Sequence, residues 1–339
     1  MAMESASGVL LFIFVCGPLP LVWGLKLLLS RGSSSLARFA GAVLALGGGA
    51  VTGLVAWLIH DLSTGGFTKG RVLRLQGRAR VARRAIGKGW ADDTVPELSG
   101  LSAWQRTVLG EAWLYSAGME HASVPAFSKL SLKLSALGAP SALLEDCHLA
   151  ALDEVRHARR CFAMARAYSG MPWTAGMLPE LAQAASQPLP AGTENDWARL
   201  VRGSLLDGCL SEGLASRVAE EGARQATDPV VRETLSVIAE DEGRHAELGW
   251  DVIDFALERG GGSAREALRQ ALTELASREA PAMPPIPGVD EAFLARNGLL
   301  PQAELGRLMR LCVESTRARA EALLPPSSPR DVEPRLSFQ

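Results

Sequence analysis

Asp153-Glu154-Val155-Arg156-His157-Ala158 and Asp241-Glu242-Gly243-Arg244-His245-Ala246 are two near copies of one six-residue motif. Each copy contains a Glu-x-x-His pair. Three residues along a helix turn through about 300°, so the carboxylate and the imidazole emerge on one face. One such pair is ordinary on a solvated helix. Two copies in one chain predict a shared site.

The segments around the motifs have helical periodicity and read as four helices. We expect them at about 102–137, 141–168, 196–225 and 229–258. Gly138-Ala139-Pro140 predicts a tight first turn, and Thr227-Asp228-Pro229 is a helix-start signal. The connection 170–194 contains several prolines and is long enough to cross a bundle. Because the chain also has only 2 tyrosines and 9 phenylalanines, an all-α fold is expected.

Another glutamate precedes each motif, in the helix before it. Glu120 lies on an apolar stripe of the first helix, and Glu212 lies on one of the third. A four-helix bundle that takes one Glu from each of two helices and a Glu-x-x-His from each of the others builds a dinuclear metal site. Six residues are therefore the predicted ligands: Glu120, Glu154, His157, Glu212, Glu242 and His245. The bland alternative is that the glutamates are solvated and the histidines fill the core.

The ligand types narrow the choice of metal. Carboxylate and imidazole suit Fe(II), Mn(II) or Zn(II), and without thiolate ligands an iron–sulfur cluster is disfavoured. The five cysteines contain no C-x-x-C pair, which argues against a zinc ribbon or a rubredoxin knuckle. Four glutamates would balance two divalent ions. His121, His148 and Glu111 lie off the ligand stripes, and Pro125 either kinks the first helix or marks its end.

With these residues in place, the segment 101–258 resembles the ferritin-like superfamily of di-iron carboxylate proteins, and the phrase Glu120-His121-Ala122-Ser123-Val124 resembles bacterial ferritin-like domain proteins. The resemblance implies a ferritin-like four-helix bundle with two iron ions, or manganese or a mixed pair. Asp-Glu-x-Arg-His in both hairpins is most similar to the oxygen-activating branch. There the Asp binds a metal-bound histidine and the Arg pairs with the Asp. The implied supporting residues are Asp153, Arg156, Asp241 and Arg244.

The N-terminal region is predicted to form a transmembrane hairpin. Residues 8–29 and 39–59 are apolar runs with Lys26 as their only charge, and each would span about 30 Å as a helix. A secretory signal peptide is the alternative, but residues 1–8 carry Glu4 and no basic residue. The lipid bilayer is therefore the expected partner of residues 8–59.

Basic residues near the span ends predict the orientation. The turn between the spans offers only Arg31 and Arg38. Eight basic residues follow the second span: Lys69, Arg71, Arg74, Arg78, Arg80, Arg83, Arg84 and Lys88. We expect both chain ends, and with them the bundle, on the cytoplasmic side of a bacterial-type inner membrane. The basic stretch would then lie on anionic lipid or form a solvated linker helix.

The chain thus divides into a transmembrane hairpin (1–62), a basic juxtamembrane linker (63–100), a di-metal bundle (101–260) and further helices with a Pro-rich tail (261–339). The net charge of −2 gives no indication of nucleic-acid binding. The function implied by the resemblance is a membrane-anchored di-iron oxidoreductase that reacts with O2 or peroxide, with electrons from a separate donor. The alternatives are iron handling without an organic substrate, or a membrane-tethered helical scaffold.

Overall fold

The computed structural model describes residues 70–71, 73–75, 78–179, 181–276 and 290–324, and most of them are helical. The predicted all-α class is confirmed at this level. The two predicted membrane spans, 8–29 and 39–59, lie outside the described residues. Within the described part of the chain, no helix combines the length and the apolar character needed to cross a bilayer.

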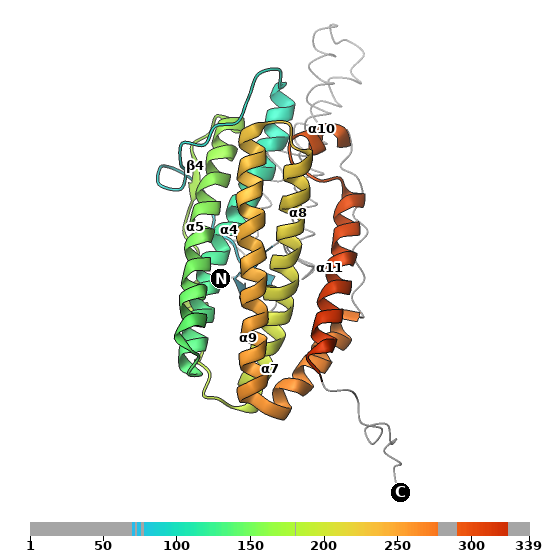
Figure 1. Cartoon of the computed structure of the whole chain (residues 1–339). Coiled ribbons are helices and arrows are strands. Elements are labelled where there is room, and N and C mark those ends of the chain that lie inside the picture. The colour runs from blue at the N-terminus through green and yellow to red at the C-terminus, as the bar shows by residue number, and fades with distance from the viewer. Residues whose placement is uncertain (1–69, 72, 76–77, 180, 277–289, 325–339) are drawn as a thin grey trace, which may run out of the picture.

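Four long helical segments lie side by side and form a bundle (Figure 1). The first hairpin joins α4 (Ala103–Ala136) to α5 (Ser141–Ser169), close to the predicted bounds. Ser102 caps α4 by accepting a hydrogen bond from the Gln105 N–H, and Gly170 ends α5 in the left-handed conformation. Pro125 lies inside α4 and does not end it. The second hairpin ends in α9 (Pro229–Ala276), which is kinked at Gly261.

The third helix of the bundle is built from three pieces, which the sequence pattern did not distinguish. It begins as α7 (Glu194–Gly203), continues through a π-helical stretch at Ser204–Leu210, and becomes α8 (Ser211–Gln225). A π turn adds a residue to the helical repeat and often marks a functional site. Here it comes directly before Glu212, one of the predicted ligands.

The long connection between the hairpins crosses the bundle as expected. It leaves the upper end of α5, contains strand β4 (Trp173–Ala175) and the short helix α6 (Leu181–Ala185), and reaches α7 at the opposite end (Figure 1). The three connections are therefore short, long and short in order. This topology places the two Glu-x-x-His helices, α5 and α9, in contact.

Within the predicted linker (63–100), the described residues form short strands and contain no helix. Strands β1 (Arg74–Leu75) and β2 (Arg78–Ala79) form one antiparallel ribbon, and β3 (Arg84–Ile86) pairs with β4 of the crossover. The Gly70 N–H donates to the Ser211 carbonyl at 3.1 Å, and the Leu73 N–H donates to the Ala122 carbonyl at 3.1 Å. These bonds hold the segment 70–73 against α4 and the start of α8.

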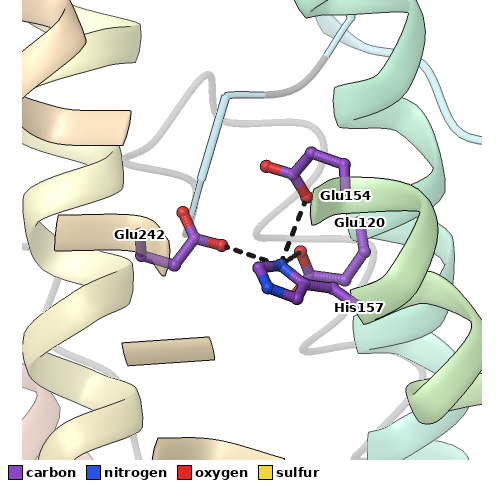
Figure 2. A group of neighbouring side chains, drawn as sticks. All are labelled: Glu120, Glu154, His157 and Glu242. Atoms are coloured by element: carbon purple, nitrogen blue, oxygen red, sulfur yellow. Dashed lines mark ion pairs between the residues drawn. The ribbon is translucent and has the colours of Figure 1, made fainter. Parts of the chain in front are cut away.

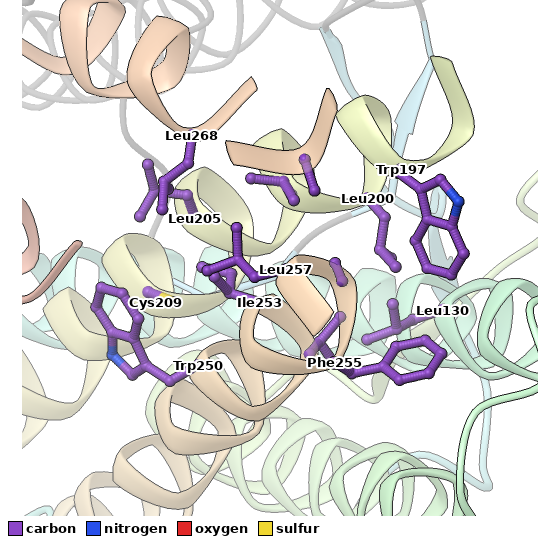
Figure 3. Packing of buried hydrophobic residues seen from close by; sticks show 14 of the residues in the cluster. Leu130, Trp197, Leu200, Leu205, Cys209, Trp250, Ile253, Phe255, Leu257 and Leu268 are labelled. Carbon is purple, nitrogen blue, oxygen red and sulfur yellow. The ribbon is translucent and has the colours of Figure 1, made fainter. Parts of the chain in front are cut away.

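Two apolar cores fill the bundle, and the predicted ligands lie between them. One core joins α7, the lower part of α9 and the facing ends of α4 and α5, with Leu130, Leu205 and Ile253 among its members (Figure 3). The other occupies the opposite end and includes Trp113 and Met164. Each of the four helical segments contributes residues to both cores. Along each segment, the predicted ligands lie between the residues of one core and the residues of the other.

The C-terminal region packs against the bundle. Past Gly261, α9 turns back along the bundle, and α10 (Glu291–Arg296) and α11 (Gln302–Ala322) follow. The kink falls within Gly260-Gly261-Gly262, where the sequence predicted a break, and Gly261 has φ 56°. Helix α11 covers α8 through a third core that includes Leu308 and Cys312.

Candidate metal centre

The six predicted ligands lie together in the middle of the bundle. Glu120 comes from α4, Glu212 from α8, and each of α5 and α9 supplies a Glu-x-x-His pair. Both histidines and the three other glutamates are at most 2% exposed. Only the Glu120 side chain is appreciably accessible, at 17%. The centre is therefore largely shielded from solvent, and Glu120 is its most exposed predicted ligand.

Donor atoms of these residues form two overlapping groups. The first contains Glu120, Glu154, His157 and Glu242, and the second contains Glu154, Glu212, Glu242 and His245. Within each group the donor atoms lie within 4.8 Å of one another. Glu154 and Glu242 belong to both groups, so they are placed to bridge two ions. Either group could hold a metal ion.

Figure 2 shows the first group, in which Glu120, Glu154 and Glu242 each direct a carboxylate oxygen toward the same nitrogen of the His157 ring. His157 Nδ1 lies 3.8 Å from Glu120 Oε2, 3.7 Å from Glu154 Oε2 and 3.7 Å from Glu242 Oε1. In the second group, His245 Nδ1 lies 3.4 Å from Glu154 Oε1 and 3.5 Å from Glu242 Oε2. Ligand atoms at about 2.0–2.2 Å from one ion are separated by about 3–3.5 Å from each other. The observed spacings need only a small contraction to meet that geometry.

The hydrogen-bond inventory supports a metal at this place. The donor atoms facing the centre are buried and have no hydrogen-bond partner among the described residues: both Glu154 oxygens, Glu212 Oε2, Glu242 Oε2, and Nδ1 of His157 and His245. Buried polar atoms are nearly always satisfied, so such a concentration of exceptions requires an explanation. A cation coordinated by these atoms satisfies all of them together. The residues present therefore fit a metal pair.

The aspartates of the two motifs hold the histidines crosswise. His157 Nε2 lies 2.8 Å from Asp241 Oδ2, and His245 Nε2 lies 3.4 Å from Asp153 Oδ2. Each aspartate thus supports the imidazole of the other hairpin. A hydrogen bond from Nε2–H to a carboxylate leaves the Nδ1 lone pair available for a metal and fixes the ring orientation.

The arginines of the two motifs pair with these aspartates and complete an outer layer of charged side chains around the predicted ligands. Arg156 pairs with Asp153, and Arg244 contacts both Asp241 and Asp153, at 3.3 Å from the latter. Burial opposes the ionisation of Asp241, but the hydrogen bond to His157 and the contact with Arg244 outweigh it and lower the pKa of Asp241 to about 2. Asp241 is therefore ionised at neutral pH. The outer layer links both hairpins around the centre.

Burial raises the pKa values of three of the four central carboxylates, whereas the neighbouring His157 lowers that of Glu120 although burial opposes it. The pKa of Glu154 rises to about 7, that of Glu212 rises well above its usual range, and that of Glu242 is raised as well. Burial alone would lower the pKa of His157 and of His245, but the surrounding carboxylates raise both well above the ordinary value. Four carboxylates crowded in a low-dielectric interior need positive charge among them. Two divalent cations supply the matching amount.

Arg71 is a component of the centre that the sequence interpretation assigned only to the basic linker. Its main-chain N–H donates to Glu212 Oε1 at 2.8 Å, and its guanidinium is buried beside the same residue. The other oxygen, Glu212 Oε2, is buried and has no hydrogen-bond partner among the described residues. No sequence pattern indicates this contact, because it depends on segment 70–73 packing against α8.

The residues that were predicted to lie off the ligand set do so. His121 contacts Trp90 edge-on at 4.6 Å, His148 is hydrogen-bonded to Ser131 at 3.0 Å, and Glu111 pairs with Arg84 on the surface. The four described cysteines, Cys147, Cys161, Cys209 and Cys312, are buried and form no disulfide. They fill apolar space, as expected for small buried side chains.

Comparison with known proteins gives no relative to guide the assignment. No family model matches the chain, and neither a curated protein nor a solved structure shows significant similarity. The functional argument therefore depends on the site itself.

Proposed function

We propose that this protein is a ferritin-like di-iron oxidoreductase, attached to a membrane through residues 8–29 and 39–59, that reacts with O2 or peroxide. The observation that carries the proposal is the set of buried, unpartnered Glu and His donor atoms in two overlapping groups. Glu120, Glu154 and His157 would hold one ion, and Glu212, Glu242 and His245 the other, with Glu154 and Glu242 as bridges. The donor set suits Fe(II), and Mn(II) or a mixed pair is chemically similar.

When bound, a ferrous pair supplies two electrons, which reduce O2 to H2O2 or H2O2 to water with protons taken from solvent. The residues of the chain orient the ligands and exclude water. Asp153 and Asp241 keep each imidazole Nδ1 aimed at the centre, and the two apolar cores exclude bulk water from it. A reduced site is neutral, because four carboxylates balance two divalent charges. A separate electron donor must return the electrons for turnover.

Iron handling without an organic substrate is the second candidate. It is favoured by the 17% exposure of the Glu120 side chain, the one predicted ligand that is appreciably accessible to solvent. The crosswise Asp–His bonds favour a resident metal pair instead, since they fix both imidazoles before metal arrives. We therefore place the oxidoreductase first. The basic residues that follow the second predicted span support a cytoplasmic position of the bundle in this proposal.

The test is an oxygen-consumption experiment on the full-length protein in a mild detergent. The protein is loaded anaerobically with Fe(II), mixed with O2, and followed with an oxygen electrode and by absorbance. An oxidoreductase consumes O2 repeatedly when a chemical reductant is supplied and keeps its iron. An iron-handling protein consumes O2 once per iron and releases or accumulates Fe(III). If the iron-loaded protein consumes O2 no faster than Fe(II) does in buffer, the result would indicate a metal-containing scaffold.

A further inference from the structure

A buried arginine beside the centre lacks a full set of partners. The Arg71 side chain is 8% exposed, and its Nε and Nη2 atoms have no hydrogen-bond partner among the described residues. Its contact with Glu212 is long, 3.9 Å from Nε to Oε1, and that oxygen already accepts the Arg71 main-chain N–H. Two N–H groups of the guanidinium are therefore free to donate.

The surroundings of the guanidinium connect it to the metal centre and to the apolar core. Arg71 Cζ lies 5.3 Å from the centre of the Phe127 ring, which packs against the His245 ring at 5.2 Å. On another side, Gly208 of the π-helical stretch leaves space for Nη2, since a Cβ there would lie 2.5 Å from that atom. Phe127 belongs to the same apolar cluster as Leu130 and Leu205.

A second cation lies in the electrostatic environment of Arg71. Lys133, on α4 and partly buried, forms no ion pair with any residue that the structure describes. Burial, together with the positive charges of Lys129 and Arg71, lowers the pKa of Lys133 to about 8. Asp207 is the acidic group that opposes these charges, and it is already bound by Arg74 at 2.9 Å. This region therefore carries an excess of positive charge.

A count of the formal charges around the centre also leaves an excess of positive charge. The four glutamates balance two divalent cations, and Arg156 and Arg244 balance Asp153 and Asp241. The buried charge of Arg71 is left over. A buried charge whose only ion pair is a long contact to a carboxylate that metal would also bind is unfavourable, so the loaded centre should attract one further negative charge.

We propose that Arg71 binds the carboxylate of a small organic acid beside the Glu212–His245 side of the centre, and that the substrate is such an acid. The inference rests on the proposed function, because the metal ions must first neutralise the glutamates. Nε–H and Nη2–H point to one side of the guanidinium and match the two oxygens of a carboxylate.

Calorimetric titration of the full-length, Zn(II)-loaded protein tests this inference without redox turnover. Metal content is measured first, and the probes are hexanoate, acetate, hexanamide and inorganic phosphate. We expect the two carboxylates, hexanoate and acetate, to bind at least tenfold more tightly than hexanamide or phosphate. Arg71→Met should weaken hexanoate binding at least tenfold. Arg84→Met, which removes a surface charge paired with Glu111, is the matched control and should change nothing.

The outcomes distinguish a failure of the proposed function from a failure of the inference about Arg71. If the unmodified protein takes up no zinc, the proposed function fails before any acid is added. If zinc binds but hexanoate and hexanamide bind equally, or Arg71→Met binds hexanoate like the unmodified protein, the inference about Arg71 is wrong. Equal binding of phosphate and hexanoate would overturn the carboxylate assignment. Should Arg71→Met fail to fold, Arg71→Lys replaces it: a lysine cannot donate two parallel bonds, so hexanoate must bind it more weakly.

Discussion

Glu154→Gln should stabilise the metal-free protein while removing most of the stabilisation that metal provides. Glu154 is completely buried, and neither of its oxygens has a hydrogen-bond partner among the described residues. A carboxylate in such a place destabilises the fold unless a cation is bound to it. Glutamine has the same shape without the charge, so the substitution separates the effect of charge from that of packing.

The magnitude follows from the pKa of Glu154. Burial raises it from the ordinary 4.5 to about 7. At about 1.4 kcal/mol per pH unit, this rise corresponds to about 3 kcal/mol of folding free energy above pH 7. The buried amide of glutamine, left unpaired, takes back about 1 kcal/mol. The net gain of about 2 kcal/mol raises the Tm by roughly 4–8 °C.

The gain depends on pH in a defined direction. Between about pH 4.5 and 7 the folded state binds a proton that the unfolded chain has released, so the stability of the unmodified protein falls as pH rises. The advantage of Glu154→Gln is therefore small near pH 4.5 and complete above pH 7.

Thermal unfolding followed by circular dichroism, at pH 5 and pH 8, measures both effects with chelator and with excess Zn(II). Glu145→Gln is the matched control, because Glu145 lies on the exposed face of the same helix. With zinc, the unmodified protein should gain several degrees and Glu154→Gln little. If Glu154→Gln lowers the Tm of the metal-free protein at pH 8, Glu154 has a stabilising structural role and the reasoning is refuted.

Three further outcomes are expected. Zinc binding should release at least one proton per chain and weaken as pH falls below about 7, because the proton on Glu154 must leave before zinc binds. Calorimetry in buffers of different ionisation enthalpy measures the number of protons released. Zinc affinity that does not change with pH would contradict this expectation. Asp241→Asn should weaken zinc affinity about 10–100-fold through His157 on the other hairpin, whereas unchanged affinity in a competition assay would remove the supporting role of Asp241. Gly208→Ala should lower the free energy of unfolding by about 1–3 kcal/mol, because its Cβ would lie 2.5 Å from Arg71 Nη2 and 3.1 Å from Gly249 Cα. Gly213→Ala is the control, since its Cβ would lie 3.9 Å from the nearest atom. Equal denaturation midpoints for the two variants would show that position 208 accommodates the methyl group.

The helices were predictable because their signals are local. Gly138-Ala139-Pro140 and Thr227-Asp228-Pro229 place the turns, and apolar periodicity sets the helix lengths to within a few residues of α4 and α5. Glu-x-x-His spacing puts each pair on one helix face whatever the tertiary fold. That the six predicted side chains lie in one layer follows from the short, long, short connections. Their role as iron ligands stays a prediction.

The remaining features depend on tertiary contacts that local patterns do not encode. The spacing of Asp153 to His157 is the same as that of Asp241 to His245, so nothing in the sequence indicates that each aspartate supports the other hairpin's histidine. The π-helical stretch before Glu212 has no sequence signature, and strands of two or three residues are too short for a period-2 pattern. Arg71 looked like one more basic residue after a membrane span.

Metal analysis of the full-length protein after anaerobic loading with Fe(II) and removal of free metal tests the di-iron centre most directly. It is made on the unmodified protein, on Glu154→Ala/Glu242→Ala, and on Glu111→Ala/Glu145→Ala as a control with the same change of charge. We predict two irons per chain in the unmodified protein and the control, and a loss of both in the double variant that lacks the bridging residues. No bound iron in the unmodified protein, or equal iron in all three, would contradict the di-iron centre.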